Sequence, residues 1–159
     1  GFAYPSISEF SDSSETALTS AGVVYARLAG NFKNFELPEN WLRWHPTCHH
    51  KDAMPLCERF MKSIDSPHTG ELLYIWGHSY EFADEDGWQY IEKLVSTLSG
   101  NDKIWYATNI EIYEYKMAQR ALYVSADETL FYNPSAIDVW VEKNRSEIIC
   151  IPAGKTVKI

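Results

Sequence analysis

The chain has 159 residues, of which 45% are hydrophobic, and this suits a globular domain with a sizeable core. Its net charge of -8 repels phosphate backbones and anionic lipids, so we expect no nucleic-acid partner and no membrane partner. No apolar run is long enough to cross a bilayer. Localisation, cytoplasmic or secreted, stays open, because the N-terminal region that would decide it is expected upstream of Gly1.

The first part of the chain alternates strands with helices. Residues 1–5 resemble the end of a strand, and residues 13–22 have the capping serine and terminal glycine of a helix. Residues 23–28 predict a second strand. This strand–helix–strand order with short connections is typical of a parallel α/β unit.

Two more helices follow in the middle of the chain. Asp52 is the predicted cap of a helix whose apolar residues recur at helical spacing, at positions 56, 60 and 64. A second helix, ending near Gly100, carries an apolar stripe that we expect to face the core. The stripe consists of Trp88, Ile91, Val95 and Leu98. A further strand is predicted at 104–107, and Asn109 opens the next helix.

Beyond residue 121 the pattern changes to short strands separated by turn residues. These strands are predicted at 121–124, 130–133, 138–141, 147–151 and 156–159. We therefore divide the chain into an α/β region, residues 1–121, and a β-rich C-terminal extension, residues 122–159.

Residues 72–82, with the sequence LLYIWGHSYEF, form an apolar run that ends at Gly77 and His78. Such a run predicts the buried strand of a parallel sheet, and ligands gather beyond the carboxyl ends of such strands. We expect Gly77 to allow a sharp turn and His78 to lie at the rim. A hydrogen-bonded structural histidine is the alternative interpretation.

The long connection before the second helix is rich in aromatic residues and closes on residues 45–50, with the sequence HPTCHH. Loops of this length are often functional. The spacing of these imidazoles and of Cys48 does not match structural zinc patterns, so we expect no metal here. We instead expect one or two of these residues to face a pocket or simply to pair with the backbone. The three cysteines, Cys48, Cys57 and Cys150, have neither redox-motif nor metal-ligand spacing.

Four segments taken together resemble the C-terminal part of the polysaccharide deacetylases, the NodB-homology family. The segments are residues 22–27 (GVVYAR), 44–50 (WHPTCHH), 74–82 (YIWGHSYEF) and 104–113 (IWYATNIEIY). The resemblance implies a partial (β/α) barrel with a β-rich appendage. It also implies hydrolysis of acetyl groups on carbohydrate with a divalent metal, zinc or similar.

The resemblance assigns roles to particular residues. His78 matches the histidine of the family's last motif and would be the general acid. The substrate-binding residues implied by the resemblance and by the aromatic pattern are Tyr4, Pro5, Trp41, Trp44, His49, His50, Trp76 and Tyr80. Ala3 stands where the family has an arginine, and either Trp41 or Trp44 can be the tryptophan that walls the acetyl pocket.

The family's Asp-Asp pair is missing from this sequence, and the H-x-x-x-H spacing of His45 and His49 lacks the expected context. We therefore expect no metal bound by this chain alone and no activity without an upstream segment. An incomplete barrel would also leave an unpaired sheet edge, which predicts self-association.

Two other functions remain open at this stage. The first is a non-catalytic carbohydrate-binding or interaction module, with Trp41, Trp44, Trp76 and Tyr80 as stacking surfaces. The second is a degenerate domain with only a structural role.

Overall fold

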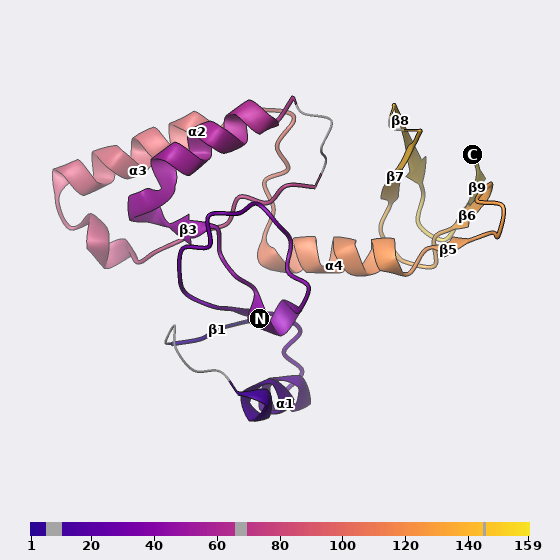
Figure 1. Ribbon diagram of the computed structural model, residues 1–159, viewed down its shortest axis with the longest axis horizontal. Coiled ribbons are helices and arrows are strands. Elements are labelled where there is room, and N and C mark those ends of the chain that lie inside the picture. The colour runs from indigo at the N-terminus through magenta and orange to yellow at the C-terminus, as the bar shows by residue number, and fades with distance from the viewer. Residues whose placement is uncertain (6–10, 66–69, 145) are drawn as a thin grey trace. The chain divides into compact units, whose positions relative to one another are not determined.

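The computed structural model describes residues 1–5, 11–65, 70–144 and 146–159. The chain forms two compact units, Gly1–Tyr106 and Ala107–Ile159, and each is described by itself (Figure 1). The expected division of the chain at residue 121 stays a prediction.

The first unit contains four very short strands. They are β1 (Phe2–Ala3), β2 (Ala26–Arg27), β3 (Cys48–His49) and β4 (Ile75–Trp76). The pairs β1–β2 and β3–β4 are both parallel, which confirms the predicted parallel arrangement. A parallel bridge between Arg27 and Trp44 continues the ladder from β2 into the segment that leads to β3.

The helices of this unit lie close to the predicted positions. They are α1 (Asp12–Ser20), α2 (Ala53–Ser63) and α3 (Glu85–Leu98), and Figure 1 shows α2 and α3 side by side. Short 3-10 turns precede or follow the strands at η1 (Trp41–Arg43), η2 (His50–Asp52) and η3 (Ser79–Phe82). Asp52 occupies the predicted cap position of α2, but its carboxylate accepts a hydrogen bond from Asn31 Nδ2 (2.8 Å) and none from the helix.

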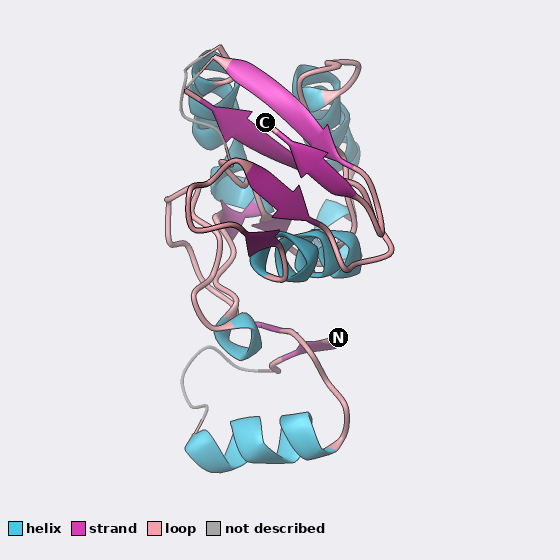
Figure 2. Cartoon of the chain, turned by 90° about the vertical axis from the view of Figure 1, so that its right-hand side faces the viewer, coloured by secondary structure: helices cyan, strands magenta, loops and turns pink. Residues whose placement is uncertain are grey.

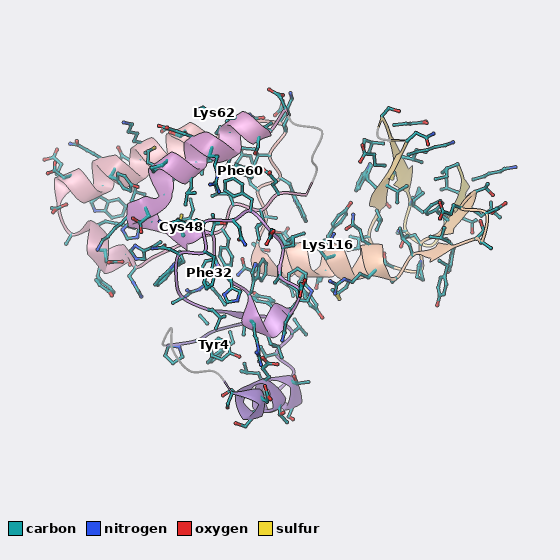
Figure 3. The ribbon with its side chains drawn as sticks, viewed as in Figure 1. Tyr4, Phe32, Cys48, Phe60, Lys62 and Lys116 are labelled. Carbon is teal, nitrogen blue, oxygen red and sulfur yellow. The ribbon has the colours of Figure 1, made fainter. Side chains whose placement is uncertain are left out.

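An apolar core lies between α2, α3 and the paired strands β3 and β4. Its buried members are Cys48, Ala53, Leu56, Cys57 and Leu94. Partly buried side chains of β4 and α3 pack against them, and Figure 3 labels Cys48 near α2. This core holds the ends of β3 and β4 in place, because the strands themselves have few ladder hydrogen bonds.

The expected apolar stripe of α3 is only partly correct. Ile91 and Leu98 do pack against the core, but Trp88 and Val95 are 54% and 55% exposed. The buried residue is Leu94. The buried face of α3 is therefore centred on Leu94, which belongs to the same buried cluster as residues of β3 and α2.

The strand predicted at 104–107 is wrong. These residues pair with no strand, and the backbone N–H of Ile104 closes a turn onto the carbonyl of Asn101 (3.0 Å). The Tyr106 hydroxyl donates to the carbonyl of Leu98 at the end of α3 (2.6 Å). The turn at 101–104 thus uses the Ile104 N–H, which a strand would have offered to a neighbour.

The second unit begins with α4 (Asn109–Arg120) and continues with antiparallel strands only (Figure 2). Glu111 accepts hydrogen bonds from the backbone (2.7 Å) and side chain (2.6 Å) of Thr108, so the pair caps the helix. The strands are β5 (Tyr123–Val124), β6 (Leu130–Tyr132), β7 (Val139–Lys143), β8 (Glu147–Ile151) and β9 (Thr156–Lys158). Their sheets have the orders β5–β6–β9 and β7–β8, and the predicted β-rich segment is confirmed.

Asn133 is the polar centre of the second unit and is fully buried. Its Nδ2 donates to the carbonyls of Ile137 (2.8 Å) and Ile151 (2.9 Å). Its Oδ1 accepts from the backbone N–H (3.0 Å) and the hydroxyl (2.7 Å) of Ser135. Each polar atom of the amide group thus has a hydrogen-bond partner, which offsets the cost of removing the group from water.

The sheets seen in the described part of the chain are small and open, so a partial (β/α) barrel remains a prediction. Within the same residues, every helix falls short of the length and apolar character that crossing a bilayer demands.

Candidate functional site

The paired strands β3 and β4 bring two histidine-bearing segments together. Cys48 lies opposite Ile75, and His49 lies opposite Trp76. Because the strands are parallel, their carboxyl ends meet at one edge. His49 ends β3, His50 begins η2, and His78 follows β4 by two residues, so three imidazoles gather beyond that edge.

Glu81, on the short turn after β4, is the centre of this histidine–glutamate cluster (His49, His50, His78 and Glu81). Its Oε2 atom lies 3.0 Å from His49 Nε2, 3.2 Å from His78 Nδ1 and 3.8 Å from His50 Nδ1. The backbone N–H of His78 also donates to this oxygen (3.3 Å). One carboxylate oxygen therefore faces three imidazole nitrogens.

Lys51 completes the electrostatics of the cluster, because its Nζ lies 2.7 Å from the other carboxylate oxygen, Oε1. The hydrogen bond from Lys51, followed by that from His78, lowers the pKa of Glu81 to about 2. The Glu81 side chain is 16% exposed and remains ionised at neutral pH. The cluster thus presents a fixed negative charge to the imidazoles.

His50 is the most buried imidazole of the cluster, with 6% of its side chain exposed. Its Nδ1 is buried and has no hydrogen-bond partner among the described residues. Burial is the main reason that its pKa lies below the ordinary value, so the ring is neutral at neutral pH. The unpaired nitrogen of a neutral, buried imidazole can bind a metal ion or accept a hydrogen bond.

Gly77 is required by this histidine and not by the sharp turn expected from the sequence. Its φ lies outside the left-handed region. A Cβ atom at Gly77 would overlap with Nδ1 of His50. The glycine therefore makes room for the imidazole, and that reason was not visible in the sequence.

His49 is held on several sides. Its backbone N–H donates to Asn31 Oδ1, and Asn31 Nδ2 in turn donates to Asp52. Its ring packs edge-to-face against Trp76, with 4.7 Å between ring centroids, and Trp76 Nε1 donates to the carbonyl of Gly30 (2.8 Å). These contacts fix the direction of Nε2 toward Glu81.

The donor atoms of His49, His50 and Glu81 all lie within 4.8 Å of one another. Two imidazole nitrogens and a carboxylate oxygen form a donor set that suits zinc and related divalent ions. Together with the unpaired Nδ1 of His50, this set fits the divalent metal that the resemblance implies.

The residues predicted around His78 do come together. The His78 side chain is 47% exposed and stacks on Tyr80, with 4.9 Å between ring centroids. Tyr80 itself is 73% exposed. Trp76 is half-buried, and its ring centroid lies 5.7 Å from that of His78. The Arg27 guanidinium lies over the Trp76 ring, 5.0 Å from its centroid.

The other predicted substrate-binding residues lie elsewhere in the unit. Trp41 and Trp44 are buried and pack edge-to-face against each other (5.0 Å), so neither offers an open ring face to a sugar. Tyr4 is half-buried, and Pro5 is exposed beside β1. The substrate-binding role of these four residues stays a prediction.

Sequence reasoning did not single out Glu81, Lys51 or Asn31. The available signal for Glu81 was its place three residues after His78, which puts both side chains on the same face of a helical turn. Lys51 and Asn31 reach the cluster only through the fold, so their spacing in the sequence carried no signal.

We compared the chain with protein-family models, with curated proteins and with solved structures, and none of the three comparisons finds a match.

Proposed function

We propose that this chain carries catalytic residues of a hydrolase of the polysaccharide deacetylase type, which removes acetyl groups from N-acetylated carbohydrate. The observation that supports this most is the position of His78. It lies beyond the carboxyl end of a parallel strand, half exposed, with Nδ1 3.2 Å from an ionised carboxylate.

This geometry suits a general acid. Nδ1–H of His78 donates to Glu81, which leaves Nε2 as the nitrogen that delivers a proton. The carboxylate orients the ring, as the acid of a catalytic triad does. An amide nitrogen leaves as an amine only after it receives a proton, and a positioned imidazolium supplies it.

A divalent metal ion, when bound, would act as a Lewis acid and polarise the acetyl carbonyl. His49, His50 and Glu81 are the described residues whose donors fit such an ion. The expectation that the chain alone is inactive rested on missing metal ligands. With this donor set in the chain, we propose that the chain is active when zinc is supplied.

The test is acetate release from N-acetylchitooligosaccharides by the whole chain with Zn²⁺ present. Loss of a positioned general acid costs about 100-fold or more, so His78→Gln should lower kcat by that factor with little change in KM. His45→Gln is the matched control, because His45 packs on Phe32 and lies outside the cluster. Equal rates for His78→Gln and the wild type would refute the role of His78.

A carbohydrate-binding module without catalysis is the second candidate, and one observation favours it. Tyr80 is exposed and its ring is supported by the His78 ring below it, which is how an aromatic platform for a sugar is built. Titration with chitin or xylan oligomers, followed by tryptophan fluorescence, separates the two candidates. Saturation without acetate release, abolished by Tyr80→Ala, would favour the binding module.

A further inference from the structure

The histidine–glutamate cluster contains a feature that hydrogen bonding alone does not explain. His50 Nδ1 is buried, lies 3.8 Å from Glu81 Oε2, and makes no hydrogen bond to any described residue. Buried polar atoms without a partner are rare in native proteins, and an unplaced ion is one of the recognised reasons. This nitrogen packs so closely against Gly77 that a Cβ atom there would overlap with it, and only glycine lets the ring lie in this position.

The distances in the cluster agree with the coordination of a small divalent ion. Zinc binds imidazole nitrogen and carboxylate oxygen at about 2.0–2.2 Å, so neighbouring donors of a tetrahedral ion lie about 3.3–3.6 Å apart. The distances from Glu81 Oε2 to His49 Nε2 and His50 Nδ1, 3.0 and 3.8 Å, bracket that separation. The two imidazole donors also lie within 4.8 Å of each other.

From these observations we propose that His49, His50 and Glu81 form a divalent-metal site, with Zn²⁺ as the preferred ion. Two histidines and one glutamate are a known donor set of catalytic zinc sites, which keep a fourth position open. The proposal deepens the proposed function, because it places the metal within this chain and beside His78. It differs from the expectation that these two histidines bind substrate and that the chain alone holds no metal.

The surroundings of the ligands fit this role. The Tyr90 hydroxyl donates to the carbonyl of His50 (2.8 Å), and Asn31 holds the backbone of His49, so both ligand segments are anchored from outside. When Nε2 of His49 binds the ion, its proton moves to Nδ1. The long hydrogen bond from the Lys51 backbone N–H to Nδ1 (3.4 Å) is then given up.

Lys51 gives the proposal its sharpest test. In the ion-free cluster its ammonium neutralises Glu81 from 2.7 Å, and it therefore competes with an added cation for the same charge. Lys51→Met should raise the affinity for Zn²⁺, by about 3-fold or more, because the competing charge is removed. A cluster that only hydrogen-bonds would not respond in this way.

The experiment is a titration of the whole metal-free chain with Zn²⁺ against a chromophoric chelator, without any sugar. We expect one ion per chain. His49→Gln and Glu81→Gln should each weaken binding by at least about 10-fold, which is the smallest loss seen when even an outer partner of a metal ligand is removed. His45→Gln, outside the cluster, should leave affinity unchanged.

Circular dichroism of the ion-free variants shows whether each one folds. If His49→Gln and Glu81→Gln do not fold, the affinity of Lys51→Met still tests the proposal. No stoichiometric zinc, or zinc that binds equally to the wild type and to a folded Glu81→Gln, would overturn the site. An unchanged or weaker affinity in Lys51→Met would also overturn it. Because no sugar is present, a failure here is distinguishable from a failure of the deacetylase proposal.

Discussion

The two units of this protein are stabilised in different ways. In Gly1–Tyr106 the strands are two residues long and parallel, and an apolar layer under α2 and α3 holds the pair β3–β4. In Ala107–Ile159 the longest strands, β7 and β8, have five residues and are antiparallel, and a fully satisfied amide lies at the centre. Short parallel strands are weak by themselves, so they depend on the helices that cover them.

This difference matches the distribution of chemistry in the chain. In the first unit, histidines gather around Glu81 beyond the ends of the short strands β3 and β4. Among the described residues, the buried Nδ1 of His50 has no hydrogen-bond partner. The second unit pairs the polar atoms of its buried Asn133 with its own backbone and Ser135. The unpartnered nitrogen of His50 thus lies where function is proposed, whereas the buried amide of Asn133 is satisfied and serves stability.

The largest expected effect comes from Asn133→Ala, which tests whether the polar centre stabilises the second unit. The change removes the Asn133 partner of the Ile151 carbonyl and of the Ser135 N–H, whereas the Ile137 carbonyl keeps its hydrogen bond from the Ser135 hydroxyl (3.0 Å). Losses of about 1–3 kcal/mol for each unsatisfied buried group predict a total of about 4 kcal/mol. Urea denaturation measures it. Asn34→Ala, at an exposed asparagine, is the control and should change stability by less than about 0.5 kcal/mol.

The next effect tests whether the helical layer stabilises the first unit. Leu94→Ala removes a buried side chain of α3 and should cost about 3 kcal/mol. Its neighbour Val95 is 55% exposed, so Val95→Ala should cost less than about 0.5 kcal/mol. Thermal unfolding of the two variants measures the difference. A larger loss in Val95→Ala than in Leu94→Ala would mean that α3 packs on the face expected from the sequence stripe.

A smaller effect is expected for Gly77→Ala, which tests the proposed zinc site separately from the stability of the first unit. Gly77→Ala forces its Cβ into the His50 ring, and overpacking of this kind costs about 2 kcal/mol. It should also weaken zinc binding. Gly100→Ala is the matched control, because Gly100 has a positive φ with open space around it. That variant should lose some stability through backbone strain and keep its zinc affinity, and a similar loss of zinc affinity in both would contradict the role of Gly77.

The smallest effect concerns the acid stability of the second unit. Hydrogen bonds from the Thr108 hydroxyl and then its backbone N–H hold the pKa of Glu111 below its ordinary value of 4.5. The ionised carboxylate therefore stabilises the folded state above about pH 4.5, and this contribution is lost as the pH falls toward the lower, folded-state pKa. Glu111→Gln should flatten the decline of the melting temperature in that range. A decline as steep as in the wild type would show that the cap contributes nothing.

Local patterns predicted most of the elements correctly. The helices α1 to α4 and the five strands of the second unit follow from capping residues, turn residues and periodicity. The strand expected at 104–107 failed, because a strand needs a neighbour and its own sequence does not provide one. The prediction of the buried face of α3 was partly wrong for a related reason. Both Leu94 and Val95 are apolar, and only the packing partner decides which of them is buried.

The amino-acid sequence by itself determined where the helices and turns lie and that His78 follows a parallel strand, because these depend on contacts between residues near in the chain. Only the tertiary structure decided that Glu81 faces His49 and His50, which lie more than 30 residues away. Their meeting depends on the register of two short strands and on the helices packed over them. Such a register is a property of the folded core, and no local pattern encodes it.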